Sequence, residues 1–389
     1  SITGQVAYLP FGPTTGMTLG AGILEINRAY DERYQFTQNT AGSITDYHYT
    51  RDPVGNIVSI TGVGEPNATG GRTTYNHQGN RLIEASGQEA AQYTYDDNGN
   101  VISDGVRTFV YNRNNRLIRV EQGGNVLGEY AYDGLERRVK KTIFGTTTHY
   151  HYDLMGNLIA ETSWDGTPFR DVFYQNGERM AMEIYGARAG TYYFLNDHLG
   201  TPHTLIDESA QVVWQAAYLP FGKAQIMTET IENHFRFPGQ YYDFETGLHY
   251  NWHRYYDPNL GRYLRADPIG LEGEINLFQY VQNNPVNLFD LKGLKGCGPG
   301  SGVWEWVIPD NPFGFNFESC CDKHDECYGC KGKAQKKTRR DCDIQFCKCL
   351  VQKCLNYNAL FKHCPSVEYC LFTATFGGRS FEKGRKCCP

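Results

Sequence analysis

Cysteine is absent from the first 294 residues of this 389-residue chain, and residues 295–389 contain all 13 cysteines. The first part therefore needs no disulfides, whereas the second has the cysteine density of a disulfide scaffold from an oxidising compartment. The chain also lacks an apolar run of 18 residues, so no segment reads as a membrane span. Its start has no basic segment followed by an apolar one and resembles the inside of a repeat. We therefore expect a fragment of a longer protein, and the missing signal peptide decides nothing.

The formal charge changes sign at the same point in the chain. Residues 1–294 have 22 Lys and Arg against 33 Asp and Glu, a net −11, whereas residues 295–389 have 15 against 10, a net +5. A chain of this length is long enough for two or three domains. Composition and charge together predict a boundary near residue 294, between an acidic large part and a basic small part that suit an enclosure and its cargo.

One phrase returns through about the first 235 residues: an aromatic residue, a polar turn with glycine, and a short alternating strand. The period of about 20 residues is typical of a stacked array in which each unit buries a face against the next. Asn-Gly and Asp-Gly turns beside short runs rich in Tyr, Val, Ile and Thr indicate β-hairpins. The clearest copies begin at Tyr49, Tyr75, Tyr95, Tyr111, Tyr132 and Tyr152.

These phrases resemble the YD repeats of Rhs proteins and of the related subunits of insecticidal toxin complexes. The segments Phe237-Pro-Gly-Gln-Tyr-Tyr-Asp243 and Arg254-Tyr-Tyr-Asp-Pro258 add to the likeness. The resemblance implies a mainly β fold, in which a long sheet spirals into a hollow shell around a variable C-terminal toxin. It implies a YD-repeat shell in residues 1–235, a plug and autoproteolysis region in 236–294, and the toxin domain in 295–389. A surface β-solenoid, in which the shell itself is the function, is the alternative for the repeats.

Two similar pentads end the repeat region, Asp267-Pro-Ile-Gly-Leu271 and Asp290-Leu-Lys-Gly-Leu294. Asp-Pro-x-Gly alone is a common turn sequence. Two carboxylates brought together cannot both ionise readily, so one holds a proton while the other acts as a base, as in aspartic proteases. The pair of pentads therefore predicts a site that cuts a peptide bond.

In Rhs proteins this region is implied to be an intramolecular aspartyl protease. The resemblance places the cut between Leu294 and Lys295, with Arg254 assisting the two aspartates, Asp267 and Asp290. Leu291 stands where proline is usual, while the aspartate and the final Gly-Leu of that pentad are intact. We expect a cut chain whose toxin stays enclosed.

The nine residues 320–328, Cys-Cys-Asp-Lys-His-Asp-Glu-Cys-Tyr, concentrate the reactive side chains of the second part. They read as part of a helix over 318–330, and residues 338–357 read as a second, antiparallel helix. Disulfides between the two helices would hold His324 opposite Asp343.

These residue types can build a metal-assisted hydrolase. His324 can take a proton from water, Asp343 can hold the imidazole in the right tautomer, and Asp325 can bind a cation that polarises a carbonyl. The glycine-rich segment 296–302 is flexible enough to wrap oxygen atoms around a hard ion, which predicts Ca²⁺. Zinc would need several free Cys or His ligands.

This constellation resembles secreted phospholipase A2, whose catalytic helix has Cys-Cys-x-x-His-Asp-x-Cys-Tyr and whose calcium loop has Cys-Gly-x-Gly. The resemblance implies His324 as the base, Asp343 as its partner and Tyr328 as a hydrogen-bond donor to Asp343. It implies Ca²⁺ ligands from the Asp325 side chain and from the carbonyls of Gly296, Gly298 and Gly300. It also implies the disulfides Cys297 with Cys321, Cys320 with Cys349, and Cys327 with Cys342. The other seven cysteines have no assigned partner.

The segment between the calcium loop and the helix is unusually aromatic. Trp304, Trp306, Phe313 and Phe315 are predicted to form the lip of an acyl-chain channel at the membrane, where Trp is favoured. Packing into the core of the domain explains them equally well.

Together these features predict an Rhs-type antibacterial toxin, whose enclosed calcium-dependent phospholipase A2 hydrolyses the sn-2 ester of membrane phospholipids after autoproteolysis behind Leu294. The expected partners are membrane phospholipid, a cognate immunity protein and a type VI secretion apparatus reached through the missing N-terminal part, without nucleic acid. We expect synthesis in the bacterial cytoplasm, secretion, and action on the target membrane from its periplasmic or extracellular side. The alternative is a catalytically inactive membrane- or receptor-binding module carried by an Rhs-like or insecticidal-toxin-like shell.

Overall fold

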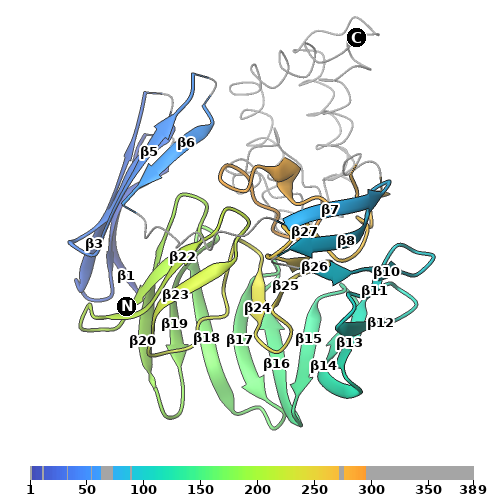
Figure 1. Cartoon of the computed structure of the whole chain (residues 1–389). Helices are drawn as coiled ribbons and strands as arrows, with labels where there is room; N and C mark the ends of the chain where they lie inside the picture. Colours follow the sequence, from blue (N-terminus) through green and yellow to red (C-terminus); the bar gives the residue numbers. More distant parts are fainter. Residues whose placement is uncertain are drawn as a thin grey trace, which may run out of the picture. The chain divides into compact units, whose positions relative to one another are not determined.

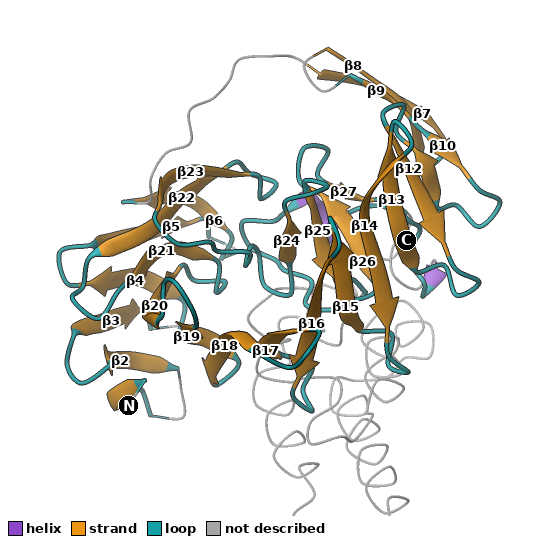
Figure 2. Cartoon of the chain, turned by 90° about the horizontal axis from the view of Figure 1, so that it is seen from below, coloured by secondary structure: helices purple, strands orange, loops and turns teal. Residues whose placement is uncertain are grey.

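The computed structural model describes residues 2–10, 13–32, 34–53, 55–62, 73–87, 90–270 and 276–294. Within these ranges the secondary structure is antiparallel β, joined by tight turns and by the 3-10 turn η2 at Val281–Asn283, and contains no α-helix (Figures 1 and 2). The expected mainly β fold is confirmed for this part of the chain. The expected helical domain in residues 295–389 lies outside the described residues. No helix in the described ranges is long and apolar enough to cross a membrane.

The strands form four sheets, and in each sheet every strand pairs with its neighbours in sequence. The six-stranded sheet consists of β1 Thr3–Tyr8, β2 Thr14–Leu19, β3 Leu24–Tyr30, β4 Phe36–Ala41, β5 Thr45–Arg51 and β6 Ile57–Thr61. The three-stranded sheet consists of β7 Thr73–Gln78, β8 Arg81–Gly87 and β9 Ala91–Gln92.

The largest sheet has fourteen strands that follow one another along the chain. Its strands are β10 Thr94–Tyr95, β11 Val101–Ser103, β12 Arg107–Tyr111, β13 Leu117–Gln122, β14 Asn125–Tyr132, β15 Arg138–Ile143, β16 Thr146–Tyr152, β17 Leu158–Ser163, β18 Pro168–Gln175, β19 Glu178–Ile184, β20 Gly190–Asn196, β21 Pro202–Ile206, β22 Val212–Tyr218 and β23 Ala224–Glu229. A four-stranded sheet follows, with β24 Tyr241–Asp243, β25 Leu248–Asn251, β26 Arg254–Asp257 and β27 Arg262–Tyr263.

The repeated phrase folds into one kind of turn, shown by the connection between β16 and β17. Asp153 Oδ1 accepts the backbone N–H of Asn157 at 2.8 Å, and Asp153 Oδ2 accepts the Asn157 side-chain amide at 2.8 Å. Gly156 has φ of +88°, a conformation that glycine adopts without steric cost. The same Asp–Asn pair closes the turns at residues 52–56 and 96–100. The turn chemistry therefore explains why aspartate, glycine and asparagine keep their spacing in the repeat.

At five turns, the tyrosine that precedes the turn ties one repeat to the previous one. Tyr152, at the end of β16, donates its hydroxyl hydrogen to the carbonyl of Arg138, the first residue of β15, at 2.8 Å. The hydroxyls of Tyr95, Tyr132, Tyr174 and Tyr218 donate to carbonyls 13 to 16 residues upstream in the same way. Each of these five tyrosines thus packs its ring against the core and satisfies a backbone acceptor of the neighbouring repeat, as expected for stacked units.

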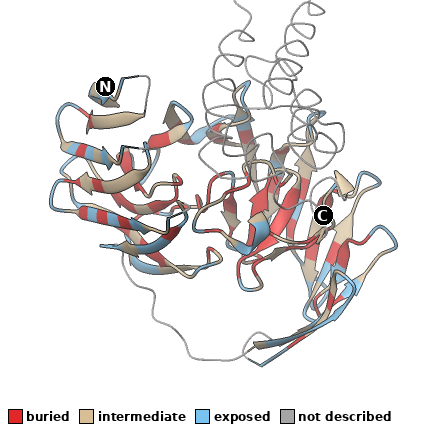
Figure 3. Cartoon of the chain, turned by 90° about the horizontal axis from the view of Figure 1, so that it is seen from above, coloured by how far each residue is buried: buried red, intermediate tan, exposed pale blue. Residues whose placement is uncertain are grey.

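The four-stranded sheet packs its tyrosines around an arginine of the fourteen-stranded sheet. β25 and β26 are buried along their whole length (Figure 3). The guanidinium of Arg138 is 1% exposed and lies within 6.0 Å of the ring centroids of Tyr130, Tyr150, Tyr241, Tyr250 and Tyr255. Tyrosines from both sheets therefore hold one buried cation, and this contact anchors the segment that carries the predicted cut site.

Candidate autoproteolysis site

The structure brings together the three residues that the sequence assigned to the cut. Arg254 begins β26, Asp267 follows β27, and Asp290 follows η2. Arg254 Nη2 lies 2.9 Å from Asp267 Oδ2 and 3.2 Å from Asp290 Oδ2. The three side chains are nearly buried, at 3%, 8% and 10% exposure for Arg254, Asp267 and Asp290. One guanidinium nitrogen therefore meets both carboxylates in a site largely closed to water.

The Asp290 carboxylate also holds the residues that lead to the predicted bond. Its Oδ1 accepts the backbone N–H groups of Lys292 at 3.2 Å and Leu294 at 3.0 Å. Such an aspartate turn is the ordinary local structure of this sequence. Here it places the last residue before the predicted cut directly on one of the two carboxylates.

Arg254 secures the same peptide from the other side. Its Nε donates to the carbonyl of Gly293 at 2.7 Å, and its Nη1 donates to the carbonyl of Leu277 at 3.3 Å. The guanidinium carbon lies 3.6 Å from the centroid of the Tyr263 ring, so the ring face stabilises the cation through a cation–π contact. The arginine is thus fixed by a carbonyl on each side and by an aromatic face.

The two carboxylates differ in their environments. Burial raises the pKa of Asp267 above its ordinary range, the Arg254 guanidinium opposes that shift, and the Asp290 carboxylate adds to it. Burial followed by the Asp290 charge raises the pKa of Tyr263 well above 10, so its hydroxyl remains a donor. That hydroxyl donates to Asp290 Oδ2 at 2.8 Å. Asp267 therefore keeps its proton to higher pH than an ordinary aspartate, while the Asp290 carboxylate accepts hydrogen bonds from Tyr263, Lys292 and Leu294.

Two close backbone approaches define the path of the 290–294 segment. Gly293 has φ of +67°, and a Cβ on it would stand 2.4 Å from the main-chain oxygen of Asn251. Gly239 has φ of +81°, and a Cβ there would stand 2.3 Å from the main-chain oxygen of Leu291. Because no side chain fits at either position, the segment is confined between two glycine contacts. Leu291, which stands in place of the usual proline, lies in this confined path.

Sequence reasoning missed three residues of the site: Tyr263, Asn251 and Gly239. Tyr263 precedes the first pentad by only a few residues, and a hydroxyl donor close to a predicted carboxylate pair is a signal that was readable. Gly239 belongs to a Pro-Gly turn, whose role toward a segment about 50 residues away is visible only in three dimensions. Asn251 ends a strand and has no local signal.

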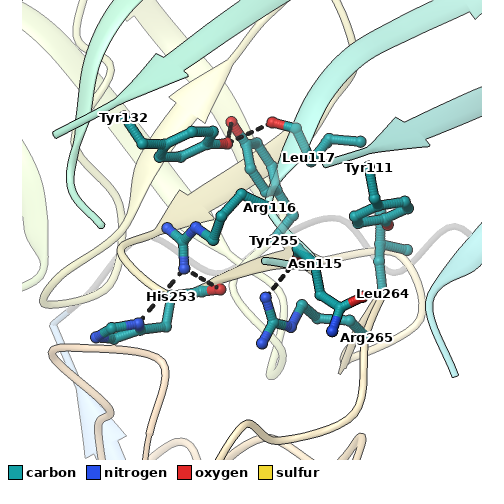
Figure 4. Close-up of a pocket in the computed structure, with 9 residues that line it drawn as sticks. All are labelled: Tyr111, Asn115, Arg116, Leu117, Tyr132, His253, Tyr255, Leu264 and Arg265. Atoms are coloured by element: carbon teal, nitrogen blue, oxygen red, sulfur yellow. Dashed lines mark hydrogen bonds between the residues drawn. The ribbon is translucent and has the colours of Figure 1, made fainter. Parts of the chain in front are cut away.

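A small cavity lies beside this site (Figure 4). Its volume of about 10 Å³ is that of roughly one water molecule, far below what a small-molecule substrate occupies. Arg116 Nη1 donates to the carbonyl of His253 at 2.8 Å across it, and Arg265 donates to the carbonyl of Asn115. Burial, with Arg116 as the next cause, lowers the pKa of His253 to about 3, so this imidazole is neutral at physiological pH. The cavity is therefore a structural void between cations and aromatic rings.

The remaining predicted residues lie outside the described part of the chain. They are the proposed catalytic His324, Asp343 and Tyr328, the Ca²⁺ ligands Gly296, Gly298, Gly300 and Asp325, the lip residues Trp304, Trp306, Phe313 and Phe315, the three disulfides, and Lys295. Within the ranges that the structure describes, no three His, Cys, Asp or Glu side chains are grouped so as to hold a metal ion.

The chain matches the family model Teneurin YD-shell over residues 17–288. It is 31% identical over 264 residues to the double-stranded DNA deaminase toxin A of Burkholderia cenocepacia (strain H111), covering 56% of this chain and 18% of that protein. It is 28% identical over 308 residues to the probable deoxyribonuclease RhsB of Dickeya dadantii (strain 3937), covering 68% and 21%. The chain thus spans about a fifth of the length of these relatives.

Among solved structures, the crystal structure of TcdB2-TccC3-Cdc42 covers 75% of this chain and 19% of its own, with a TM-score of 0.56 and 18% sequence identity. At this identity the likeness shows the fold alone. It agrees with the antiparallel strands described above.

The relatives correct two predictions. By their names they are a DNA deaminase and a deoxyribonuclease, which contradicts the phospholipase A2 predicted as the enzyme. The same names contradict the prediction of a phospholipid substrate without nucleic acid. The phospholipase motif lies in residues 295–389, beyond the family match. The prediction therefore depended on the residue spacing within that segment alone.

The expected repeat class is confirmed, because the family match begins in the second strand and ends just before the second pentad. Since this match covers more than half of its residues, the chain belongs to the Teneurin YD-shell family, as a YD-repeat shell of the Rhs toxin type.

Proposed function

We propose that this chain is the self-cutting shell of a secreted Rhs-type toxin, and that Asp267, Asp290 and Arg254 hydrolyse the Leu294–Lys295 peptide bond of the same chain. One observation carries this proposal: Arg254 meets both carboxylates while Asp290 Oδ1 accepts the N–H of Leu294. The two carboxylates, the cation and the backbone N–H of Leu294 are thereby held together, which is the kind of positioning that peptide hydrolysis requires.

The two aspartates have different roles in this proposal. Asp267, whose pKa is raised by burial, is the general acid, and Asp290 is the general base. Water attacks the carbonyl carbon of Leu294 and gives its proton to Asp290, while Asp267 gives its proton to the nitrogen of Lys295. The carbon–nitrogen bond breaks, so the shell ends in the carboxyl group of Leu294 and the released segment begins with an amine. Arg254 keeps both carboxyls and the Gly293 carbonyl in register.

Intact-mass measurement of the purified chain tests this proposal. The wild type should give a species that ends at Leu294 and a second species that begins at Lys295. Asp267→Asn, Asp290→Asn and Arg254→Gln should leave the chain whole, because each removes one of the joined groups. A wild type that stays whole, or an Asp290→Asn variant that is cut at the same bond, would refute the proposal.

For the segment released by the cut, the names of the relatives favour nucleic acid as the substrate class. This inference rests on those names alone, because the family match ends at residue 288. The test is to incubate the cut protein with double-stranded DNA, with transfer RNA and with phospholipid vesicles. Base conversion or strand breakage supports the inference, whereas fatty-acid release without any change in the nucleic acids would reverse it.

A further inference from the structure

We propose that Asn251 is a positioning residue of the cut site. Its side-chain amide fixes both the main chain and, through Tyr263, the carboxylate of Asp290. This inference rests on the proposed self-cutting. The Asn251 side chain contacts neither the predicted scissile bond nor the Arg254 guanidinium. It acts on the cut through Asp290.

Asn251 lies where a rigid element meets the site. It is the last residue of β25, it is 0% exposed, and it pairs in register with Arg254 at the start of β26. A side chain on a strand inside a sheet is held more precisely than one on a loop. Asn251 and Arg254 therefore approach Asp290 from one fixed hairpin.

One nitrogen of Asn251 serves both ends of Asp290. Asn251 Nδ2 donates to the main-chain oxygen of Asp290 at 2.9 Å and to the Tyr263 hydroxyl oxygen at 2.8 Å. The Tyr263 hydroxyl in turn donates its hydrogen to Asp290 Oδ2 at 2.8 Å. The amide thus holds the Asp290 backbone directly and the Asp290 carboxylate through the tyrosine.

The backbone of Asn251 also controls the peptide just before the cut. Its main-chain oxygen would lie 2.4 Å from a Cβ on residue 293, so only glycine fits at that position. The residue therefore contacts Asp290 with its side chain and confines Gly293 with its backbone. Both contacts act on the turn that presents Leu294 to Asp290.

The amide has no part in the chemical step, so its removal should slow the cut without abolishing it. Without the Nδ2 donor, the Asp290 main chain and the Tyr263 hydroxyl can each shift, and a displacement of about 1 Å can cost on the order of 100-fold in rate. In metal sites, loss of a hydrogen bond that orients a ligand typically costs about 10- to 100-fold in affinity or activity. We expect Asn251→Ala to cut on the order of 10- to 100-fold more slowly than wild type.

The test follows the cut of the full chain after pulse labelling in cell-free translation. Asn251→Ala, Tyr263→Phe, the double variant and Asn39→Ala are compared with wild type, and Asp267→Asn serves as the uncut reference. Asn39 is the matched control, because its Nδ2 also makes a buried bond to a main-chain oxygen, that of Asn196 at 2.8 Å, and this bond involves none of Asn251, Tyr263 and Asp290. Because Asn251 and Tyr263 act on the same carboxylate, the double variant should be slowed by less than the product of the two single effects.

The outcomes separate this inference from the proposed function. Slow cutting of Asn251→Ala, with wild-type cutting of Asn39→Ala and the expected coupling to Tyr263→Phe, supports it. Wild-type cutting of Asn251→Ala overturns it, and so does equal slowing of Asn39→Ala or full independence from Tyr263→Phe, since these indicate general loss of stability. A wild type that is never cut, or an Asp267→Asn variant that is cut, overturns the self-cutting itself and this inference with it.

Discussion

The guanidinium of Arg138 and the carboxylate of Asp243 form an ion pair whose side chains are 1% and 0% exposed. Arg138 begins β15 in the fourteen-stranded sheet, and Asp243 ends β24, so the pair joins residues 105 positions apart. Lys141 Nζ lies 2.8 Å from the same carboxylate. This aspartate thus contacts two buried cations at the junction between the repeats and the segment that carries the cut site, and Glu245 Oε2 lies 3.3 Å from Lys141 Nζ as a second carboxylate.

Replacing this aspartate with its neutral counterpart should destabilise the shell strongly. Asp243→Asn leaves Arg138 buried without its carboxylate and leaves Lys141 with Glu245 alone, at 3.3 Å, and breaking a buried pair in this way typically costs about 3–5 kcal/mol. Urea unfolding in the uncut Asp267→Asn background measures the loss. The control is Asp46→Asn, since the Asp46 side chain is 60% exposed and its replacement should leave the unfolding midpoint nearly unchanged. Equal midpoints for the two variants would contradict the prediction.

The same carboxylate should make the shell sensitive to acid. Burial by itself would raise the pKa of Asp243, but Arg138 and Lys141 together outweigh burial, and the pKa is lowered. A lowered pKa means that the stabilisation is present above the ordinary aspartate pKa of about 3.9 and is lost as the pH falls through the folded value. The gap in thermal midpoint between wild type and Asp243→Asn should therefore close as the pH falls below about 4. A gap that stays constant from pH 7 to pH 3 would show that the pair is not the source.

Much of the repeat architecture was predictable, because its signals are local. The Asp153–Asn157 turn and the Gly156 conformation follow from short-range turn chemistry, and the alternation of the strands follows from the period of two. The buried position of Arg138 was not predictable from its own sequence. An arginine on a strand usually faces water, and its burial here depends on Tyr241, Tyr250 and Tyr255, more than 100 residues away.

The charged residues of the cut site were also predictable from the sequence, whereas the residues that position them were not. Asp267 and Asp290 were recognised because similar pentads drew attention to them, and Arg254 was carried by the resemblance. The Asn251 amide contacts Asp290, and Gly239 contacts Leu291. Both contacts join segments far apart in the sequence, and no sequence pattern predicts them. The enzyme class predicted for residues 295–389 is wrong, because the motif lies in one small segment and the relatives of the repeats that precede it are a deaminase and a deoxyribonuclease.

The close approach of Gly239 to the main chain of Leu291 should make alanine harmful to cutting. A Cβ at residue 239 would stand 2.3 Å from the Leu291 oxygen, so Gly239→Ala must shift the main chain of Leu291 and with it the turn in which Asp290 holds Leu294. We expect the cut to slow on the order of 100-fold, the cost of a displacement near 1 Å. The fraction of cut chain after pulse labelling measures this effect.

Gly247→Ala is the matched control for that variant. Gly247 has φ of +71°, close to the +81° of Gly239, but a Cβ there has no atom within 4 Å. Both variants therefore carry similar backbone strain, and only one of them displaces the cut segment. Equal slowing would show that strain in the four-stranded sheet, rather than contact with Leu291, limits the cut.

The repeat turn offers a test of how a single hairpin is stabilised. Asp153→Ala removes the acceptor for the backbone N–H groups of Met155 and Asn157 and for the Asn157 amide. The loss should lower the free energy of local opening by about 1–3 kcal/mol, measured by hydrogen exchange of the 148–162 region in the uncut variant. Leu154→Ala is the control on the same turn, because Leu154 is 100% exposed. Faster exchange in both variants, or in neither, would contradict this role of Asp153.

The pH dependence of the cut should reveal which aspartate is the acid. Because burial raises the pKa of Asp267 despite the opposing Arg254, the protonated form of Asp267 persists to higher pH than in an ordinary aspartate and declines as the pH rises through the folded value. If Asp267 gives its proton to the leaving nitrogen, the cut should be faster at pH 5 than at pH 8. The uncut chain, purified in urea and refolded by dilution into buffers between pH 5 and pH 9, allows the rate to be followed by intact mass, with Asp290→Asn as the variant that stays whole throughout. A rate that rises steadily toward pH 9 would assign the acid to another group and leave Asp267 with a structural role beside Arg254.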